Sequence, residues 1–393
     1  LSDYGFTKDI TFQLGAQYKA NVQNSTILMG IENQGSWLKD EKLGYPDHEN
    51  AFMMNESLVI PHIPNTVVAD QNLSIFGTFM QYEYKLRKLT ASVGLRYDHY
   101  EILDNNHEND PVSGDVLSPR INLLYNITGF LQGRLSYSQG YRAPQIFDED
   151  LHIETSGSRK VLHRNSPDLI QETSQSYMVS MDLNKNWNTL HFKFLAEAFY
   201  TRLNNPFSNE YGEPDDHGTV IYIRVNAKDG ASVKGTNLEM TFIPSGNFVF
   251  NSGITLQSGK FDEIQEFGSK AFFRSPSVYG FVMADWDVAQ KFCINATGNY
   301  TGSMYIPYFG LAIENPEEGE LRKTNPFYDL GLRFQYELRL NGTKIHLFTG
   351  VKNMLNSYQH DLDAGINRDP GYVYGPSMPR TIYVGLKIGN MLK

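Results

Sequence analysis

Apolar and polar residues alternate over long stretches of this chain. Between residues 10 and 20 every second residue is apolar or aromatic, and the same period of two recurs over residues 89–97 and 328–340. Successive side chains of a β-strand point to opposite faces, so this pattern predicts strands with one apolar and one polar face. The same pattern predicts further strands at residues 131–137, 190–200, 238–242, 248–256, 292–300 and 382–388.

The predicted strands are too long and too regularly connected for an ordinary soluble sheet. We count about fifteen, many of them about 10 residues long, where soluble strands average about 5–6 residues and a tilted strand needs about 9–11 residues to cross a bilayer. Short turns, as at residues 87–88, alternate with long loops, as at residues 39–71, 142–170 and 356–379. The strands of a soluble β-sandwich or propeller also alternate apolar and polar residues, but this regular alternation of short turns and long loops is typical of outer-membrane barrels. We therefore predict an all-β fold, an antiparallel up-and-down transmembrane β-barrel.

Composition narrows the function classes. The net charge of −10 argues against a nucleic-acid partner, and a single cysteine, Cys293, excludes an internal disulfide and a cysteine-rich zinc site. No run of 18 apolar residues predicts a transmembrane helix. No linker or low-complexity tract divides the chain, so residues 1–393 are predicted to form one domain. No catalytic motif is present, and we do not expect an enzyme.

Four short motifs resemble those of TonB-dependent outer-membrane receptors. An aromatic-Arg-Ala-Pro element ends a predicted strand, a Pro-Asp-Leu element follows it, a Gly-x-x-x-Glu strand comes next, and an Asn-x-x-Asn pair precedes a Pro-Arg near the final strand. The residues are Tyr141, Arg142, Ala143 and Pro144, then Pro167, Asp168 and Leu169, then Gly235 and Glu239, then Asn353, Asn356, Pro379 and Arg380. We interpret these residues as shaping the barrel: proline ends a hydrogen-bonded ladder, and Gly235 is expected at a bulge or tight bend.

The long loops hold the candidate binding residues. Asp148, Glu149 and Asp150 offer the oxygen ligands that Ca²⁺ prefers, although a solvated acidic loop is the simpler interpretation. His152 and His163, beside Arg164, fall where haem receptors of the resembled family often place a histidine, which would make an axial ligand. A second set is aromatic and expected to be exposed, suited either to a large amphipathic ligand or to interfacial anchoring: Tyr305, Tyr308, Phe309, Tyr372 and Tyr374.

The resemblance implies a function and partners. It implies an outer-membrane receptor for energised uptake of an iron-siderophore, haem or cobalamin-like nutrient, with no intrinsic cofactor. TonB and an inner-membrane motor would act through an N-terminal region, and outer-membrane lipid would surround the barrel. A passive porin-type channel is the alternative, and an outer-membrane enzyme is a third class. The resemblance also implies about 22 strands, so we expect the plug and first strands to be absent here, the chain to start at the extracellular rim, and the first and last strands not to pair.

Overall fold

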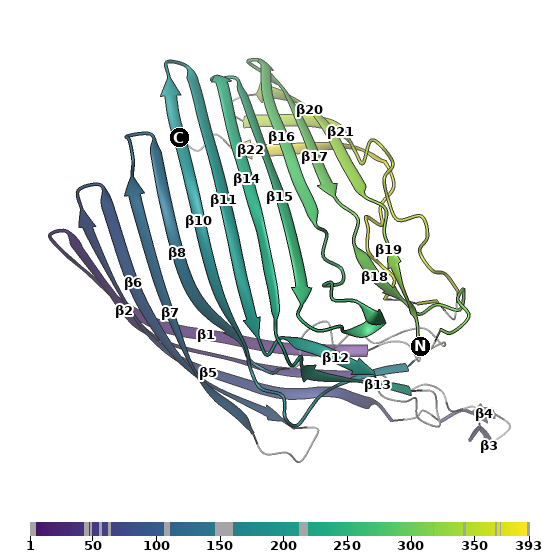
Figure 1. Cartoon of the computed structure of the whole chain (residues 1–393). Helices are drawn as coiled ribbons and strands as arrows, with labels where there is room; N and C mark the ends of the chain where they lie inside the picture. The colour runs from purple at the N-terminus through teal and green to yellow at the C-terminus, as the bar shows by residue number, and fades with distance from the viewer. Residues whose placement is uncertain are drawn as a thin grey trace.

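The main body of the protein is one antiparallel sheet of 15 strands, shown in Figure 1. The computed structural model describes residues 5–42, 47, 49–54, 57–61, 64–105, 111–145, 160–211, 219–316, 318–340, 343–365, 368–369 and 371–390. The strands of this sheet, in order, are β1 (Gly5–Val22), β2 (Ser25–Lys42), β5 (Thr66–Leu86), β6 (Leu89–Asp104), β7 (Val112–Asn126), β8 (Leu131–Arg142), β10 (Glu172–Trp187), β11 (Leu190–Asn204), β14 (Ala231–Ser245), β15 (Phe248–Phe261), β16 (Val278–Ala289), β17 (Phe292–Thr301), β20 (Phe327–Leu340), β21 (Thr343–Lys352) and β22 (Thr381–Asn390).

The sheet curls around a hollow without closing. Each strand pairs with its neighbour in the order of the chain, and β1 and β22 form the two edges. Among the described residues β1 does not pair with β22. The predicted strand number of about fifteen, the up-and-down order and the lack of direct pairing between first and last strand are therefore confirmed. Several strands exceed the prediction: β2 extends to Lys42 and β5 begins at Thr66, inside the stretch expected to be loop.

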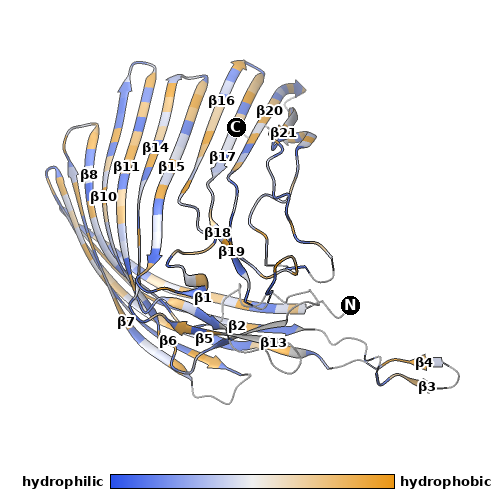
Figure 2. Ribbon diagram, turned by 45° about the vertical axis from the view of Figure 1, so that its right-hand side comes forward, coloured by the Kyte–Doolittle hydropathy of each residue, from blue (hydrophilic) through white to orange (hydrophobic). Residues whose placement is uncertain are grey.

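Figure 2 shows hydrophobic and hydrophilic residues alternating along the strands. The large apolar residues of this pattern are exposed, as Leu14 and Val93 are, and they share the outer face of the sheet. On the edge strand β22, Val384 is 84% exposed on this face. Near the long-loop end, tyrosines from adjacent strands lie side by side, with ring centroids 5.1 Å apart for Tyr137 and Tyr177. Near the short-turn end lies Trp187, with the Lys185 ammonium 4.8 Å from its ring. We call the aromatic residues at these two ends of the outer face the aromatic girdles. Tyr177 and Trp187 are ten positions apart on β10, roughly 25 Å along the normal of a tilted strand, which matches the apolar band of a membrane barrel.

The long loops contain sheets of their own that alternation did not predict. In one, β12 (Phe207–Tyr211) pairs with β13 (Thr219–Asn226), which pairs in parallel with β9 (Lys160–Asn165). In a second, β18 (Tyr305–Tyr308) pairs with β19 (Glu320–Lys323). In a third, β3 (Phe52–Met54) pairs with β4 (Ser57–Val59). A one-turn 3-10 helix covers Glu266–Gly268. In the described part of the chain, no helix is long and apolar enough to cross a membrane.

The asparagines of the resembled motifs tie loop ends together. Asn353 donates from Nδ2 to the Ser357 and Met378 carbonyls at 3.1 and 3.0 Å, and the Arg380 N–H donates to Asn356 Oδ1 at 2.9 Å. These bonds join the two ends of the loop between β21 and β22. Asn165 similarly donates to the Pro144 carbonyl at 2.9 Å. Buried amides that bond backbone carbonyls across a loop hold its base in one conformation.

The bulge expected at Gly235 is not there. Gly235 pairs in regular register with Phe199 on one side and Gln257 on the other. The register shift of β14 lies between Phe242 and Ser245. A Cβ at Gly235 would lie 2.6 Å from the Phe199 ring and 2.4 Å from the Leu256 carbonyl oxygen, so the glycine makes room for an aromatic side chain on the inner face.

Candidate ligand-binding site in the long loops

The β18–β19 hairpin and the loop before β22 share a buried aromatic core. Met304, Ile306, Tyr308 and Tyr372 form this cluster, and the rings of Tyr308 and Tyr372 meet edge to face with centroids 4.7 Å apart. Arg322 of β19 lies over it, with its guanidinium carbon 3.6 Å from the Tyr308 ring centroid. A cation placed over an aromatic face is attracted by the ring quadrupole, so Arg322 fastens the hairpin to this core.

Carboxylates of the same loop accept bonds from the tyrosines. Asp361 accepts from the hydroxyls of Tyr372 at 2.9 Å and Tyr374 at 2.5 Å, and Asp363 accepts from Tyr308 at 3.2 Å. The Phe309 N–H donates to Asp369 at 2.8 Å. Each carboxylate is therefore occupied by protein donors. Among the described residues, no group of three or more His, Cys, Asp or Glu side chains is placed to hold a metal ion.

Two further side chains clamp the segment that carries Tyr372. Arg274, from the loop between β15 and β16, donates to the carbonyls of Gly371 at 2.6 Å and Val373 at 3.0 Å. Gln359 is buried, donates to the Tyr372 carbonyl at 2.8 Å and accepts from the Tyr374 N–H at 2.9 Å. Three loops that are remote in sequence are thus joined into one unit, which we call the loop core.

The loop core shifts the pKa of its own groups. Burial raises the pKa of Tyr308, Tyr372 and Tyr374, and the neighbouring carboxylates raise it further. Burial also pushes the pKa of Asp361 upward, but the hydroxyls of Tyr374 and Tyr372 outweigh it and hold that pKa below its ordinary value. The loop core therefore favours neutral tyrosines around an ionised aspartate.

We expect the loop core to loosen at both pH extremes. A raised tyrosine pKa means that its stabilisation is complete below about pH 10 and is lost as pH rises through the folded pKa. The lowered pKa of Asp361 means that its stabilisation is present above about pH 4 and is lost as pH falls below that value. Tyrosinate absorbance of the wild type minus Tyr372→Phe should show a titration above that of free tyrosine; a difference titration at or below pH 10 contradicts this.

The structure separates the aromatic residues that the sequence grouped. Tyr305 is 41% exposed, whereas Tyr308 and Tyr372 are each 3% exposed. The expectation that all of these rings are exposed is wrong for Tyr308 and Tyr372, because they pack on each other and under Arg322. Tyr374 is half-buried against them, and Phe309 contacts Phe267 with ring centroids 5.9 Å apart. Only part of this aromatic set can therefore meet a ligand directly.

The other candidates lie in or near the loop between β8 and β10. Asp148, Glu149, Asp150 and His152 lie outside the described residues. His163 belongs to β9, where it is paired with Tyr222, and Arg164 of the same strand is exposed. Strand β9 belongs to the sheet of β12, β13 and β9, which is separate from the β18–β19 hairpin of the loop core. Sequence reasoning missed Arg322, Arg274 and Gln359, since no local pattern distinguishes them from other polar loop residues.

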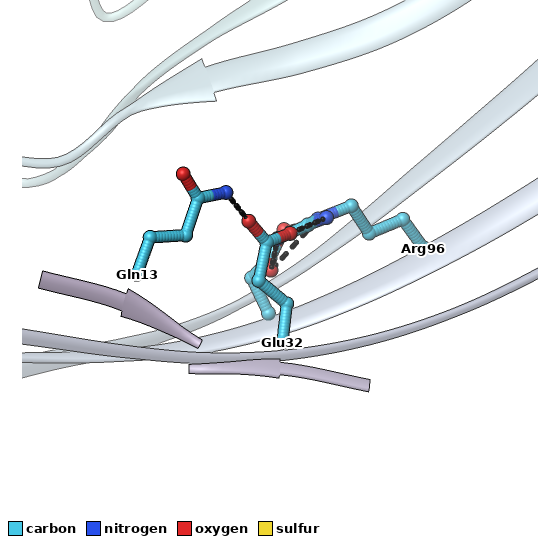
Figure 3. A network of polar contacts seen from close by, with 4 residues as sticks. Gln13, Glu32 and Arg96 are labelled. Atoms are coloured by element: carbon cyan, nitrogen blue, oxygen red, sulfur yellow. Dashed lines mark hydrogen bonds and ion pairs between the residues drawn. The ribbon is translucent and has the colours of Figure 1, made fainter. Parts of the chain in front are cut away.

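Charged and polar side chains form networks on the inner face of the sheet, one of which is shown in Figure 3. Arg96 of β6 lies 2.8 Å from Glu32 of β2 and 2.8 Å from Asp98, and Gln13 of β1 donates to Glu32. Further along, Asn237 donates to Glu197 at 2.9 Å. The strand register places these groups on the face opposite the apolar one. A polar inner wall can contact water, a ligand in transit or a plug.

Comparison with known proteins shows which family and which solved structures this chain is similar to. A family model described as "TonB dependent receptor-like, beta-barrel" matches residues 2–354. Among solved structures, the copper transporter OprC superposes with a TM-score of 0.69 at 13% identity, over 97% of this chain and 57% of that one. The FrpB iron transporter from Neisseria meningitidis gives 0.65 at 13% identity, over 97% and 55%. The ferric-catecholate import receptor Fiu from E. coli K12 gives 0.63 at 16% identity, over 97% and 54%.

At such identities the solved structures establish the shared fold, and this chain spans about half the length of each of them. No curated protein sequence is significantly similar to this chain. The family model, by contrast, covers nearly the whole chain, in agreement with the motifs and with the 15-stranded sheet. The chain therefore belongs to the TonB-dependent receptor-like β-barrel family.

Proposed function

We propose that this chain supplies most of the barrel of an outer-membrane receptor that imports a metal chelate, with energy delivered through TonB. The observation that carries the proposal is the family match over residues 2–354. The sheet supports it, because its outer face is apolar between aromatic girdles while its inner wall is polar. Structural neighbours described as iron and copper transporters favour a metal complex as the substrate class.

The loop core supports a receptor rather than an open pore. A passive channel needs loops that leave its mouth accessible, whereas here loops remote in sequence are fastened to each other by Arg274, Gln359 and Arg322. Rigid loops lower the conformational cost of binding, which favours capture of a dilute ligand. Haem and cobalamin remain alternative ligands, and calcium at residues 148–150 remains a proposal for residues outside the described part of the chain.

Uptake measurements test the proposed function. A strain lacking the gene should lose accumulation of radioactive iron supplied as a ferric chelate, and the full-length gene should restore it. Collapsing the proton gradient with an uncoupler should abolish the restored uptake, because TonB-driven transport needs an energised inner membrane. A panel of ferric chelates, haem, copper and cobalamin identifies the substrate. Uptake that continues in the presence of the uncoupler would instead indicate a passive channel.

The exposed and buried tyrosines should respond differently to mutation. Tyr305→Ala removes an exposed ring and is expected to weaken ligand binding by roughly 5–30-fold, the loss of about 1–2 kcal/mol typical of an aromatic contact, with unchanged hydrogen exchange in the loops. Tyr308→Ala should increase exchange around residues 304–308 and 369–376, because it removes a ring from the loop core. If Tyr305→Ala binds the identified substrate like the wild type, Tyr305 is not part of the site.

A further inference from the structure

The outer wall has an apolar groove between the aromatic girdles. It spans β11, β14, β15, β16, β17 and β20 and has a volume of about 440 Å³. Small residues form its floor, Ser252, Gly280 and Gly298, and larger ones form its walls, among them Phe194, Ile254 and Tyr300. Its depth depends on the glycines: a Cβ at Gly298 would lie 2.8 Å from Val282 and 2.9 Å from Leu330.

A second hollow adjoins this groove on the side of the long loops. Strand β16 begins only at Val278, whereas β15 continues to Phe261, and residues 270–277 run along that end of β15, with Lys260 bridged to Ala271. A notch remains between this segment, the end of β15 and the segment joining β17 to β18. The hollow in this notch measures about 290 Å³. Its lining includes the ammonium-bearing Lys260 and Lys323 and the hydroxyl-bearing Ser258, Ser303 and Tyr305, and Tyr300 lines both hollows.

The two lysines give the notch a net positive charge. Lys260 lies on the outer face, because every second residue of a strand shares a face and Ile254, Leu256 and Ser258 precede it on that face. Lys323 is the strand partner of Tyr305. Neither ammonium has a carboxylate partner among the described residues. The acid nearest to Lys260 along the chain, Asp262, is paired with Arg202 at 2.6 Å, and the acid nearest to Lys323, Glu320, is paired with Arg322 at 2.5 Å. The notch therefore offers two lysines and several hydroxyls to an anion.

The depth of the two hollows matches the layers of a membrane. Tyr300 and Tyr328 of adjacent strands have ring centroids 5.0 Å apart and belong to the girdle at the long-loop end, where tyrosine rings lie among lipid headgroups. The apolar groove lies on the hydrocarbon side of this girdle and the notch lies on the aqueous side. An acyl chain fits the groove, and a phosphate group fits the notch.

We propose that the groove and the notch together bind one phosphorylated membrane lipid of the outer leaflet, with an acyl chain against Gly280 and Gly298 and its phosphate between Lys260 and Lys323. Continuity with the lipid-facing wall favours a lipid over a soluble ligand, and the paired lysines favour an anionic headgroup over a zwitterionic one. The inference rests on the outer-membrane location contained in the proposed function, and it does not depend on which nutrient is imported.

Lipid binding by the full-length protein tests the inference. We would measure the affinity of phosphatidylglycerol by native mass spectrometry and by titration in phosphatidylcholine nanodiscs. Lys260→Gln and Lys323→Gln should each weaken binding about 5-fold, and the double variant about 25-fold. Ser252→Leu should fill the groove and weaken phosphatidylglycerol binding while leaving inorganic phosphate binding unchanged. Lys193→Gln on the inner face and Thr349→Leu on the outer face of β21 are matched controls and should behave like the wild type.

Each outcome decides the matter. Weaker lipid binding in the lysine and Ser252 variants with normal controls supports the inference. Equal phosphatidylglycerol affinity in the wild type and the double lysine variant overturns it. If the lysine variants lose inorganic phosphate but Ser252→Leu binds lipid normally, the notch is an anion site and the lipid assignment is wrong. If the protein binds the lipid specifically but fails the uptake assay, the proposed transport function is wrong and the lipid inference stands.

Discussion

Replacing Arg96 by methionine is expected to lower the free energy of unfolding by about 3 kcal/mol. Arg96 lies between two carboxylates, at 2.8 Å from Glu32 Oε2 and 2.8 Å from Asp98 Oδ1. Asp98 is only 2% exposed, so its charge cannot be relieved by water once the guanidinium is gone. Breaking a buried pair by removing one partner leaves an uncompensated charge, which costs more than the pair itself contributes.

The side chains of Arg96 and Asp98 are packed closely against the strand beneath them. A Cβ at Gly77 would lie 2.4 Å from Asp98 Oδ1 and 2.6 Å from Arg96 Nη2, so the charged groups rest directly on a glycine backbone. Unfolding of the full-length protein by urea in lipid vesicles measures the effect. Lys85→Met is the control: Lys85 is 65% exposed and pairs with Glu83 at 3.3 Å, so its loss should cost less than about 1 kcal/mol. Equal effects of the two variants would show that the Arg96 cluster is solvated.

An arginine in place of Leu332 is expected to destabilise the barrel by about 2–4 kcal/mol, because Leu332 lies on the lipid-facing side of β20 near mid-strand. Its strand partners on that face are Ala296 and Val351. The neighbouring position gives a matched comparison. Arg333 lies on the inner face, 4.4 Å from the Phe348 ring, and its Nε is buried with no hydrogen-bond partner among the residues that the structure describes.

Arg333→Leu should change stability by less than about 1 kcal/mol. It removes the ring contact and the hydrogen bond from Nη2 to Gln335 Oε1 at 2.6 Å, but it also removes a buried polar atom without a partner. Both variants can be compared by the same urea titration in vesicles of phosphatidylcholine. A larger loss for Arg333→Leu than for Leu332→Arg would invert the assignment of the two faces.

The sheet was predictable from the sequence and the loop core was not, for a physical reason. Strand positions and faces follow from local alternation, which is why β1, β6 and β20 lie where the pattern placed them. Burial of Tyr308 depends instead on Tyr372 and Arg322, and the clamp by Arg274 acts on Val373, 99 positions away in the chain. A period of two carries no information about such contacts, so exposed and buried loop tyrosines look alike in the sequence.

Two further features of the strands also depend on contacts between segments that are remote in the sequence. From the sequence Gly235 is expected at a bulge or tight bend, yet it lies in regular register, where the Phe199 ring of the neighbouring strand packs over it. Likewise β9 forms in the middle of a long loop because β13 offers it a parallel partner, which no feature of residues 160–165 announces by itself.

The order of strands in the sheet has a consequence for how the molecule forms. In the 15-stranded sheet, the strands lie in the same order as along the chain, so each strand is hydrogen-bonded to the sheet strand before it and the sheet strand after it, from β1 and β2 to β21 and β22. Such a topology has a low contact order, because each new strand docks on the one made just before it, and the entropy lost on closing each intervening loop grows only slowly with its length. Folding can thus advance hairpin by hairpin along the chain. The two outer edges stay open to pairing until the end, so edge protection during assembly, rather than strand formation, becomes the step at which misfolding competes.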